Sequence, residues 1–544
     1  MGFFGFFSAM AVQVAVTNGV RVGWFEEMMP SLDGVKLYTY GVAPKEGVKC
    51  PIVIQRDPYV KEQRIDGPAF AYERIGALAR GYAYVVQHVR GAGMSEGRRI
   101  PYEHEREDGL ALLEYARRLP WYNGEIYLAG ASYLASAHWS YLETNPPDVK
   151  GASLAIQDVN RYNICYRNGF KKWHLHGSWF MKEYAKNDHS VVRAKDVRFT
   201  DFPLIDFTRR LFGHSIEAYD NTLLHPLPDD PFWSSDEPGS GAGYRRALLR
   251  STMPVLLKTG FYDIYTEGIC DMWREIPPER RANCALLIDA YDHGGRLSRD
   301  MEGTFGEFPG GSRAEEKVDD LDWFDAIRAG KMCKGAPANK TRYYALWENS
   351  WHEEPALVDG PRRVVLPLGG GVRDYIYNPK RPLPGFPGSG ALGFGGMRFQ
   401  PAPGFRDDVL SYLLPPITER LDVRGRMTAR LTVSSDCEDT CFYVRMSVKK
   451  PDGKWYLLRD DITSILFQRW RYEPNSRCTL SFRFADHAFR LNAGDQLRVD
   501  VASACSQFAP HANVRGRQAF ICKPKIAHNC VYADGSELVL NVLR

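Results

Sequence analysis

Residues 126–139 read IYLAGASYLASAHW, and this stretch decides which fold the chain adopts. The apolar run 126–129 has the length of a buried parallel strand, and after Gly130 the chain passes into Ala, Leu and Ser residues that favour a helix. A serine at such a strand-to-helix turn is lifted off the edge of the sheet, as in the G-x-S-x-G elbow that carries a nucleophile. Ser132 is therefore either a nucleophile or the N-cap of the helix.

The stretches on either side of Ser132 predict a parallel sheet. Apolar and polar residues alternate over 20–30 and 35–44, as in a hairpin. Residues 51–57 and 82–89 have the pattern of buried strands, whereas 71–80 and 109–119 have helical periodicity. Strand-helix order resumes over residues 253–290. This alternation implies a parallel sheet with helices on both faces, in which functional groups gather at the carboxyl ends of the strands.

Changes in composition and periodicity along the chain predict its domains. We expect an N-terminal extension over residues 1–18, a core over 19–157 and 236–345, an aromatic and mostly helical cap over 158–235, and an all-β domain over 346–544. The stretch PGFPGSGALGFGG at 384–396 is expected to be a loop, because no Lys-Ser/Thr pair or helix follows it, as a phosphate loop requires.

The bulk composition excludes several classes of partner. The 544 residues include 70 basic and 66 acidic side chains, so nothing favours nucleic acid or an anionic membrane as a partner. Eleven cysteines without a CxxC pair, and an apolar N-terminus without a basic region, predict a cytoplasmic protein, with a cryptic secretion signal as the alternative.

No metal or organic cofactor is expected. Cys437 and Cys441 lack a second pair at metal-finger spacing. His174 and His176 alternate as two ligands on one strand face would, but no partner ligand is identifiable, and a structural role is favoured for both.

A nucleophilic serine needs a base and an orienting carboxylate. In α/β-hydrolases these follow the nucleophile in the order acid, then histidine, each at the end of a strand. Asp263 directly follows one predicted strand and His293 follows the next, with about 30 residues between them for a helix and a strand. The weaker alternatives are histidines placed within a helix or strand and carboxylates that flank His293: His138, His88, Asp289 and Asp292.

The chain resembles the cocaine-esterase or CocE/NonD family of hydrolases, which includes Xaa-Pro dipeptidyl peptidases and α-amino-acid ester hydrolases. The resemblance covers nearly the whole chain from about residue 19 and is weakest in the cap. Its motifs are RDPY at 56–59, GYAYVVQHVRGAGMSEG at 81–97, GASYLA at 130–135, TGFYDIY at 259–265, DHGG at 292–295, YALWENSWHEEP at 344–355, VSSDCEDTCFYVRM at 433–446 and VDVASACSQFAPHANV at 499–514.

This resemblance implies the α/β class, with an α/β-hydrolase core, an inserted helical cap and a C-terminal all-β jelly-roll domain. It also implies that Ser132 is the nucleophile, His293 the general base and then acid, and Asp263 its orienting partner. The oxyanion hole would pair the N–H of Tyr133 with the hydroxyl of Tyr59, which is a sensible donor for a developing oxyanion. At position 135, where family members usually carry glycine, this chain has alanine.

The predicted function is that of a serine hydrolase that cleaves an ester or amide bond of a small acyl substrate through an acyl-enzyme. The alternatives are an Xaa-Pro dipeptidyl peptidase, an acyltransferase or thioesterase on the same triad, or a non-catalytic ligand-binding protein. A peptidase that recognises a substrate ammonium would need carboxylates, and the cap offers Glu183, Asp188 and Asp201. The sequence leaves open whether the chain forms a homo-oligomer.

Overall fold

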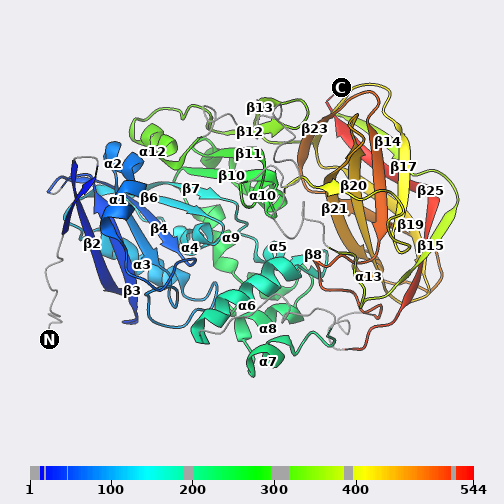
Figure 1. Ribbon diagram of the computed structural model, residues 1–544, viewed down its shortest axis with the longest axis horizontal. Helices are drawn as coiled ribbons and strands as arrows, with labels where there is room; N and C mark the ends of the chain where they lie inside the picture. Colours follow the sequence, from blue (N-terminus) through cyan, green and yellow to red (C-terminus); the bar gives the residue numbers. More distant parts are fainter. Residues whose placement is uncertain are drawn as a thin grey trace.

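The computed structural model describes residues 13–17, 20–45, 47–188, 201–295, 318–384, 396–515 and 522–543. Figure 1 shows a large α/β domain joined to an all-β domain, with a group of helices lying below the junction. The residues before 13 and most of the predicted loop at 384–396 fall outside the described part.

One mixed sheet of eleven strands forms the α/β domain, and its central strands, from β5 to β12, run parallel. These central strands are short apolar runs, as expected for a sheet covered on both faces. In spatial order the strands are β1 (Gln13–Thr17), β2 (Val20–Pro30), β3 (Lys36–Ala43), β5 (Ala83–His88), β4 (Cys50–Asp57), β6 (Tyr122–Ala131), β7 (Val149–Ala155), β10 (Val255–Tyr262), β11 (Ala285–Asp292), β12 (Lys340–Ala345) and β13 (Ser350–Glu354).

Helices follow the parallel strands, as the alternating pattern predicts. Asp66 and Asp319 cap two of these helices by accepting hydrogen bonds from backbone N–H groups in the first turn. The helices are α1 (Gly67–Glu73), α2 (Ile75–Ala79), α3 (Glu105–Ala116), α4 (Tyr133–Trp139), α10 (Thr266–Glu275), α11 (Pro278–Arg281) and α12 (Asp320–Arg328).

The cap is formed by short helices that lie beside the carboxyl ends of the parallel strands (Figure 1). Residues 173–178 form a π-helix, so His174 and His176 do not lie on one face of a strand as two metal ligands would. Aromatic residues around these histidines pack into a hydrophobic cluster of their own. The elements are α5 (Arg161–Cys165), β8 (Tyr166–Arg167), β9 (Phe170–Lys171), α6 (Trp179–Tyr184), α7 (Phe207–Phe212) and α8 (Glu217–Leu224); the next helix, α9 (Ala242–Arg250), packs against α4 of the core.

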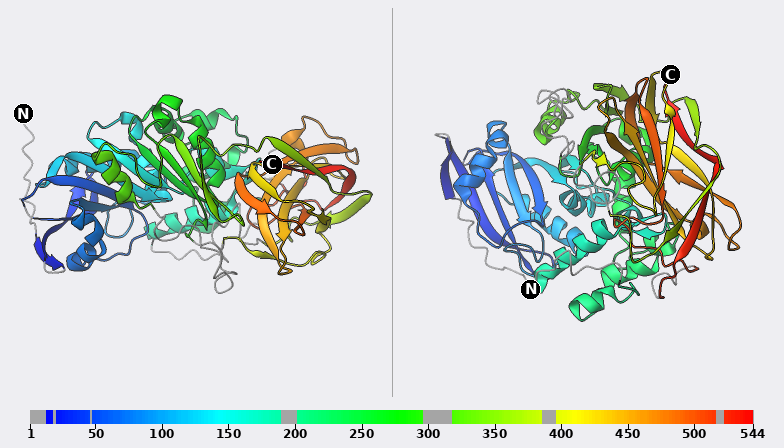
Figure 2. Two further views of the ribbon diagram at one scale, coloured as in Figure 1. Left: turned by 90° about the horizontal axis from the view of Figure 1, so that it is seen from above. Right: turned by 45° about the vertical axis from the view of Figure 1, so that its right-hand side comes forward.

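The C-terminal domain consists of two packed antiparallel sheets, which Figure 2 shows face to face. The first sheet contains β14 (Arg362–Pro367), β15 (Val372–Tyr377), β18 (Leu421–Gly425), β19 (Thr428–Ser435), β22 (Cys478–Arg483), β23 (His487–Leu491) and β25 (Ala527–Val542). The second contains β16 (Phe399–Gln400), β17 (Leu410–Pro416), β20 (Cys441–Lys449), β21 (Trp455–Ser464) and β24 (Gln496–Ala502), and α13 (Ile465–Gln468) follows β21.

Buried ion pairs join the two large domains. Arg274 of α10 and Arg426 of the β domain both bond the fully buried Asp486, with the Arg426 Nε to Asp486 Oδ2 distance at 3.1 Å. Such pairs are costly to break, because removing one partner leaves a buried charge uncompensated. The predicted fold class, an α/β-hydrolase core with a helical cap and a C-terminal β domain, is confirmed, whereas the domain boundaries remain predictions.

Among the described residues, no helix is long and apolar enough to cross a membrane. All eleven cysteines are free thiols. In the same part of the chain, no three His, Cys, Asp or Glu side chains lie close enough together to hold a metal ion.

Candidate active site

Ser132 lies at a sharp turn between the end of β6 and the start of α4. Its backbone has φ 56° and ψ −127°, a conformation that costs a residue with a side chain about 1–3 kcal/mol. A Cβ on Gly130 would lie 2.7 Å from the backbone of Leu134, so the close approach of β6 to α4 requires glycine there. The Ser132 side chain makes no capping hydrogen bond to α4, which removes the N-cap alternative.

Three predicted residues meet at this turn. The Ser132 Oγ to His293 Nε2 distance is 2.9 Å, and the His293 Nδ1 to Asp263 Oδ1 distance is 2.7 Å. A carboxylate only accepts hydrogen bonds, so His293 Nδ1–H donates to Asp263 and Nε2 accepts from the Ser132 hydroxyl. The structure therefore brings together Ser132, His293 and Asp263 in one hydrogen-bonded chain.

The position of Asp263 is fixed by its own backbone and neighbours. Asp263 is 3% exposed, and its second oxygen accepts from Thr259 Oγ1 at 2.8 Å. Thr266 Oγ1 donates to the carbonyl groups of Asp263 and Gly260, which holds the turn between β10 and α10. The carboxylate thus faces His293 at the carboxyl end of β10, as the order of strands predicts.

Tyr59 reaches the same site from the loop after β4. Its hydroxyl accepts a hydrogen bond from Trp179 Nε1 at 3.2 Å, so its own O–H remains available to donate. Desolvation and the nearby Glu183 carboxylate raise the pKa of the Tyr59 hydroxyl, which keeps it protonated. Its ring is 46% exposed, because it forms part of the wall of an open pocket.

The side chain of Tyr133 is fixed in place by hydrogen bonds and by a cation above its ring. Its hydroxyl donates to Glu105 Oε1 at 2.7 Å and accepts from the backbone N–H of Tyr102 at 2.7 Å. Arg99 stacks over the buried ring, with its guanidinium carbon 4.5 Å from the ring centroid. As the first residue of α4, Tyr133 has no acceptor within the helix for its backbone N–H.

Position 135 departs from glycine without disturbing this geometry. Ala135 is fully buried, and its N–H donates to the Ser132 carbonyl at 3.0 Å. The methyl group therefore fits the packing of α4 while the hydrogen-bonded chain at Ser132 stays intact.

A pocket of about 430 Å³ opens over Ser132. Its walls are mainly aromatic and aliphatic, and a few uncharged polar groups are placed among them. The lining residues are Tyr59, Tyr102, Tyr133, Trp179 and Tyr265; Ile156, Ile164, Leu175 and Ile264; and Ser132, Gln157, His176 and His293. In the part of the chain that the structure describes, no Asp, Glu, Lys or Arg lines this pocket.

Two of the cap carboxylates that were candidates for ammonium recognition, Glu183 and Asp201, do not line this pocket. Glu183 is buried and bonds Lys186 at 2.9 Å, and its other cationic neighbour is Arg99 at 3.7 Å. Asp201 is exposed, and the side chain of Asp188 lies outside the described part.

The rival histidines are committed to other contacts. His138 Nε2 contacts the Ala129 carbonyl at 3.2 Å, and burial lowers its pKa to about 3. His88 Nδ1 accepts from the Met94 N–H, and burial lowers its pKa to about 4. Neither histidine takes part in the hydrogen-bonded chain at Ser132.

Sequence reasoning missed the residues that the cap contributes to the pocket. His176 lines the pocket, and its Nε2 accepts from Arg161 at 2.7 Å. Arg161 is buried and lies over the ring of Tyr102, which forms another part of the wall, at 3.7 Å. The aromatic richness of the stretch KKWHLHGSWFMKEYAK was the only signal that could have indicated these residues.

Two family models match the chain. Residues 33–295 match the family described as X-Pro dipeptidyl-peptidase (S15 family), and residues 394–536 match its X-Pro dipeptidyl-peptidase C-terminal non-catalytic domain. The chain belongs to the CocE/NonD and X-Pro dipeptidyl-peptidase (S15) family. As an S15-family serine hydrolase, it acts on esters or amides.

Relatives of this S15-family chain are distant in sequence. A cocaine esterase of Rhodococcus sp. (strain MB1 Bresler) is 22% identical over 492 residues, which span 82% of this chain and 84% of that protein. An aminopeptidase structure from the archaeon Thaumarchaeota shares the fold over the full length of both chains, with a TM-score of 0.79 and 17% identity. An α-amino acid ester hydrolase structure has a TM-score of 0.77 and 18% identity, covering 97% of this chain and 98% of that one.

Proposed function

We propose that this chain is a carboxylic ester hydrolase that uses Ser132, His293 and Asp263 as a catalytic triad. The observation that carries the proposal is the unbroken hydrogen-bonded chain from Ser132 Oγ through His293 to Asp263, at the foot of an uncharged pocket. A non-catalytic ligand-binding protein would have no need of a serine held at positive φ with a base aimed at its hydroxyl.

The mechanism follows from the roles of these groups. Ser132 Oγ attacks the ester carbonyl while His293 Nε2 takes its proton, and Asp263 stabilises the imidazolium that forms. The Tyr59 hydroxyl and the Tyr133 N–H donate to the oxyanion. His293 then protonates the leaving alcohol, and a water molecule, activated by the same histidine, hydrolyses the acyl-enzyme and releases the acid.

The walls of the pocket favour a neutral substrate. Burying an ionised group in an apolar pocket is costly unless an opposite charge meets it. Since no described residue of the lining is charged, a substrate ammonium of the kind an aminopeptidase binds would find no carboxylate there. The rings of Tyr102, Trp179 and Tyr265 instead suit an apolar or aromatic acyl or alkoxy group.

A panel of three substrate classes tests this proposal. Aryl esters, Xaa-Pro anilides and acyl thioesters would be compared by kcat/KM on the native chain and on Ser132→Ala. We expect the native chain to cleave aryl esters best. We expect the Ser132→Ala variant to lose turnover of all three substrate classes. Preferential cleavage of the anilides would overturn the ester assignment in favour of a dipeptidyl peptidase, and preferential cleavage of thioesters would indicate a thioesterase.

A further inference from the structure

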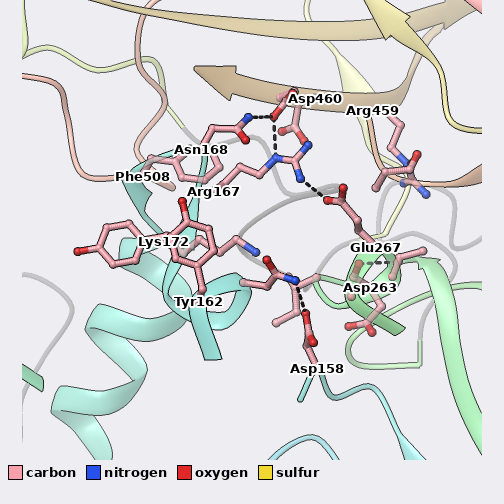
Figure 3. Close-up of a pocket in the computed structure, with 17 residues that line it drawn as sticks. Asp158, Tyr162, Arg167, Asn168, Lys172, Asp263, Glu267, Arg459, Asp460 and Phe508 are labelled. Carbon is pink, nitrogen blue, oxygen red and sulfur yellow. Dashed lines mark hydrogen bonds and ion pairs between the residues drawn. The ribbon is translucent and has the colours of Figure 1, made fainter. Parts of the chain in front are cut away.

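Residues 263–268 form a thin wall between two cavities. Ile264 and Tyr265 line the catalytic pocket, and the residues after them line a second cavity of about 100 Å³. This second cavity lies where the hydrolase core meets residues 158–172 of the cap and residues 459–461 of the β domain, and we call it the interdomain chamber (Figure 3). Ile264 contributes to the walls of both cavities.

The charges in the interdomain chamber are mostly paired with one another. Arg167 bonds Asp461 at 2.8 Å and also pairs with Glu267, so it links the cap to the β domain and to α10 (Figure 3). Asp158 accepts from Asn163 Nδ2 at 3.1 Å. Each carboxylate thus has a donor, although carboxylates outnumber cations among the lining residues.

Lys172 is the exception among these charged groups. It is only 9% exposed, and within the described part of the chain its ammonium group has no hydrogen bond or ion pair. Its side chain extends into the middle of the interdomain chamber (Figure 3). Burial lowers the pKa of Lys172 to about 8, so the group is still mostly protonated at pH 7. The charges of Glu267 and Asp158 act on this ammonium group without a direct contact, so its N–H donors remain available to an anion.

The side chain of Ile264 is the part of this wall that faces both cavities. On the chamber side, a Cβ added to Gly268 would lie 1.8 Å from Asp158 Oδ2, so the backbone of the turn is packed directly against that carboxylate. On the other side, Asp263 holds His293. Ile264 itself is 8% exposed and apolar, and it makes no polar contact that a shorter side chain would lose.

We propose that Ile264 determines specificity by closing the catalytic pocket off from the interdomain chamber, so that a shorter side chain at this position admits a substrate carboxylate to Lys172. This inference rests on the proposed ester hydrolase function. In the native enzyme the acyl and alkoxy groups stay within uncharged walls, and an ester that ends in a carboxylate is rejected because its charge finds no partner. The chemical class that the opened site would take is a monoester of a dicarboxylic acid or of an ω-hydroxy acid.

The test compares esters that differ only at the end of one chain. Mono-p-nitrophenyl adipate is paired with p-nitrophenyl hexanoate for the acyl side, and 5-acetoxypentanoate is paired with pentyl acetate for the alcohol side. For each pair the ratio of kcat/KM, carboxylate-ended over methyl-ended, is measured at pH 7 on the native enzyme, Ile264→Ala, the matched control Ile264→Val, and Ile264→Ala combined with Lys172→Met. A ratio within one enzyme preparation does not depend on how much of a variant is folded.

We expect the ratio to rise about tenfold or more in Ile264→Ala for one of the two pairs, because a charge-assisted hydrogen bond to Lys172 becomes available. It should stay near the native value in Ile264→Val and return to it in the double variant. An unchanged ratio in both pairs, a rise that survives Lys172→Met, or a gain for the corresponding ammonium-ended esters instead would each overturn the proposal. Native enzyme that cleaves none of the methyl-ended esters would overturn the proposed function itself, which is a separate and earlier result.

Discussion

The catalytic pocket and the interdomain chamber lie on opposite sides of one short turn, and the two buried aspartates near this turn, Asp263 and Asp158, make different contacts. Asp263 lines the chamber, but its carboxylate accepts a hydrogen bond from the ring of His293 on the pocket side. Asp158 lies among arginine, lysine and carboxylate groups that largely cancel one another. The same residue type therefore orients the imidazole of His293 at one position and belongs to a cluster of mixed charges at the other.

Loss of the nucleophile is the largest effect that this comparison predicts. Ser132→Ala should lower kcat for an aryl ester by about 10⁴-fold or more, because only binding and oxyanion stabilisation remain. The matched control is Ser136→Ala one turn along α4, where the buried hydroxyl has no role in the hydrogen-bonded chain. Steady-state kinetics on both variants checks this, and equal losses in the two would contradict it.

Replacing the two aspartates separates the two cavities directly. Asp263→Asn should reduce kcat by about 10⁴-fold, because an amide favours the wrong tautomer of His293. Asp158→Asn, on the other side of the same turn, should change kcat no more than a few-fold. The pair is measured with one aryl ester at one pH, and a similar loss in both variants would mean that the interdomain chamber takes part in the chemistry.

Removing one oxyanion donor gives the next largest effect. Tyr59→Phe should lower kcat by about 10²-fold to 10³-fold with a smaller change in KM, as expected for a donor that acts mainly in the transition state. Tyr133→Phe is the control, since it keeps the backbone N–H and loses the hydroxyl contacts to Glu105, Tyr102 and Arg99. The control should lose about 1–3 kcal/mol of stability and little activity. A large loss of kcat in Tyr133→Phe with little loss in Tyr59→Phe would mean that the Tyr133 hydroxyl, and not that of Tyr59, serves the oxyanion.

The smallest predicted effect is a dependence of stability on pH that originates in the interdomain chamber. Burial raises the pKa of Asp158 to about 7, against the partly offsetting hydrogen bonds from Asn160 and Asn163 and the charge of Lys172. The unfolded chain releases this proton near pH 4, so the folded state loses stability as pH rises from about 4 to 7. Asp158→Asn does not bear that cost, so its stability relative to the native chain should rise over this window, as measured by urea unfolding.

Asp422 of the β domain provides a control of opposite sign. Burial alone would raise its pKa, but hydrogen bonds from Arg420 and Arg490 lower the pKa to about 2. Its ionised form therefore stabilises the fold above about pH 4, and this contribution is lost as pH falls towards 2. Asp422→Asn should fall behind the native chain as pH rises from 2 to 4, by about 1 kcal/mol after allowance for screening at the exposed Arg420. If the stability of both variants relative to the native chain changed with pH in the same direction, both assignments would be contradicted.

Local pattern and strand order were enough to predict the fold class and the meeting of Ser132, Asp263 and His293. Each of these residues follows an apolar run that ends at the same edge of a parallel sheet, so periodicity alone places them near one another. Tyr59 was indicated only by the family resemblance, because nothing local distinguishes it from a tyrosine that packs against the core.

The rest of the pocket could not be predicted, because it depends on contacts across the chain. Trp179 bonds a tyrosine 120 positions before it, and Arg167 pairs with Asp461 across 294 positions. The π-helix at 173–178 has two histidines spaced as on a strand, and tertiary packing of the neighbouring aromatic residues overrides that local pattern.

Labelling with a fluorophosphonate probe tests the central claim, an activated Ser132, most directly. The native chain and Ser132→Ala would be treated in parallel and analysed by intact mass. The account predicts a single phosphonyl adduct on the native chain and none on the variant, since His293 makes only that hydroxyl nucleophilic. A well-folded native chain that takes up no probe, or a variant that is labelled equally, would contradict it.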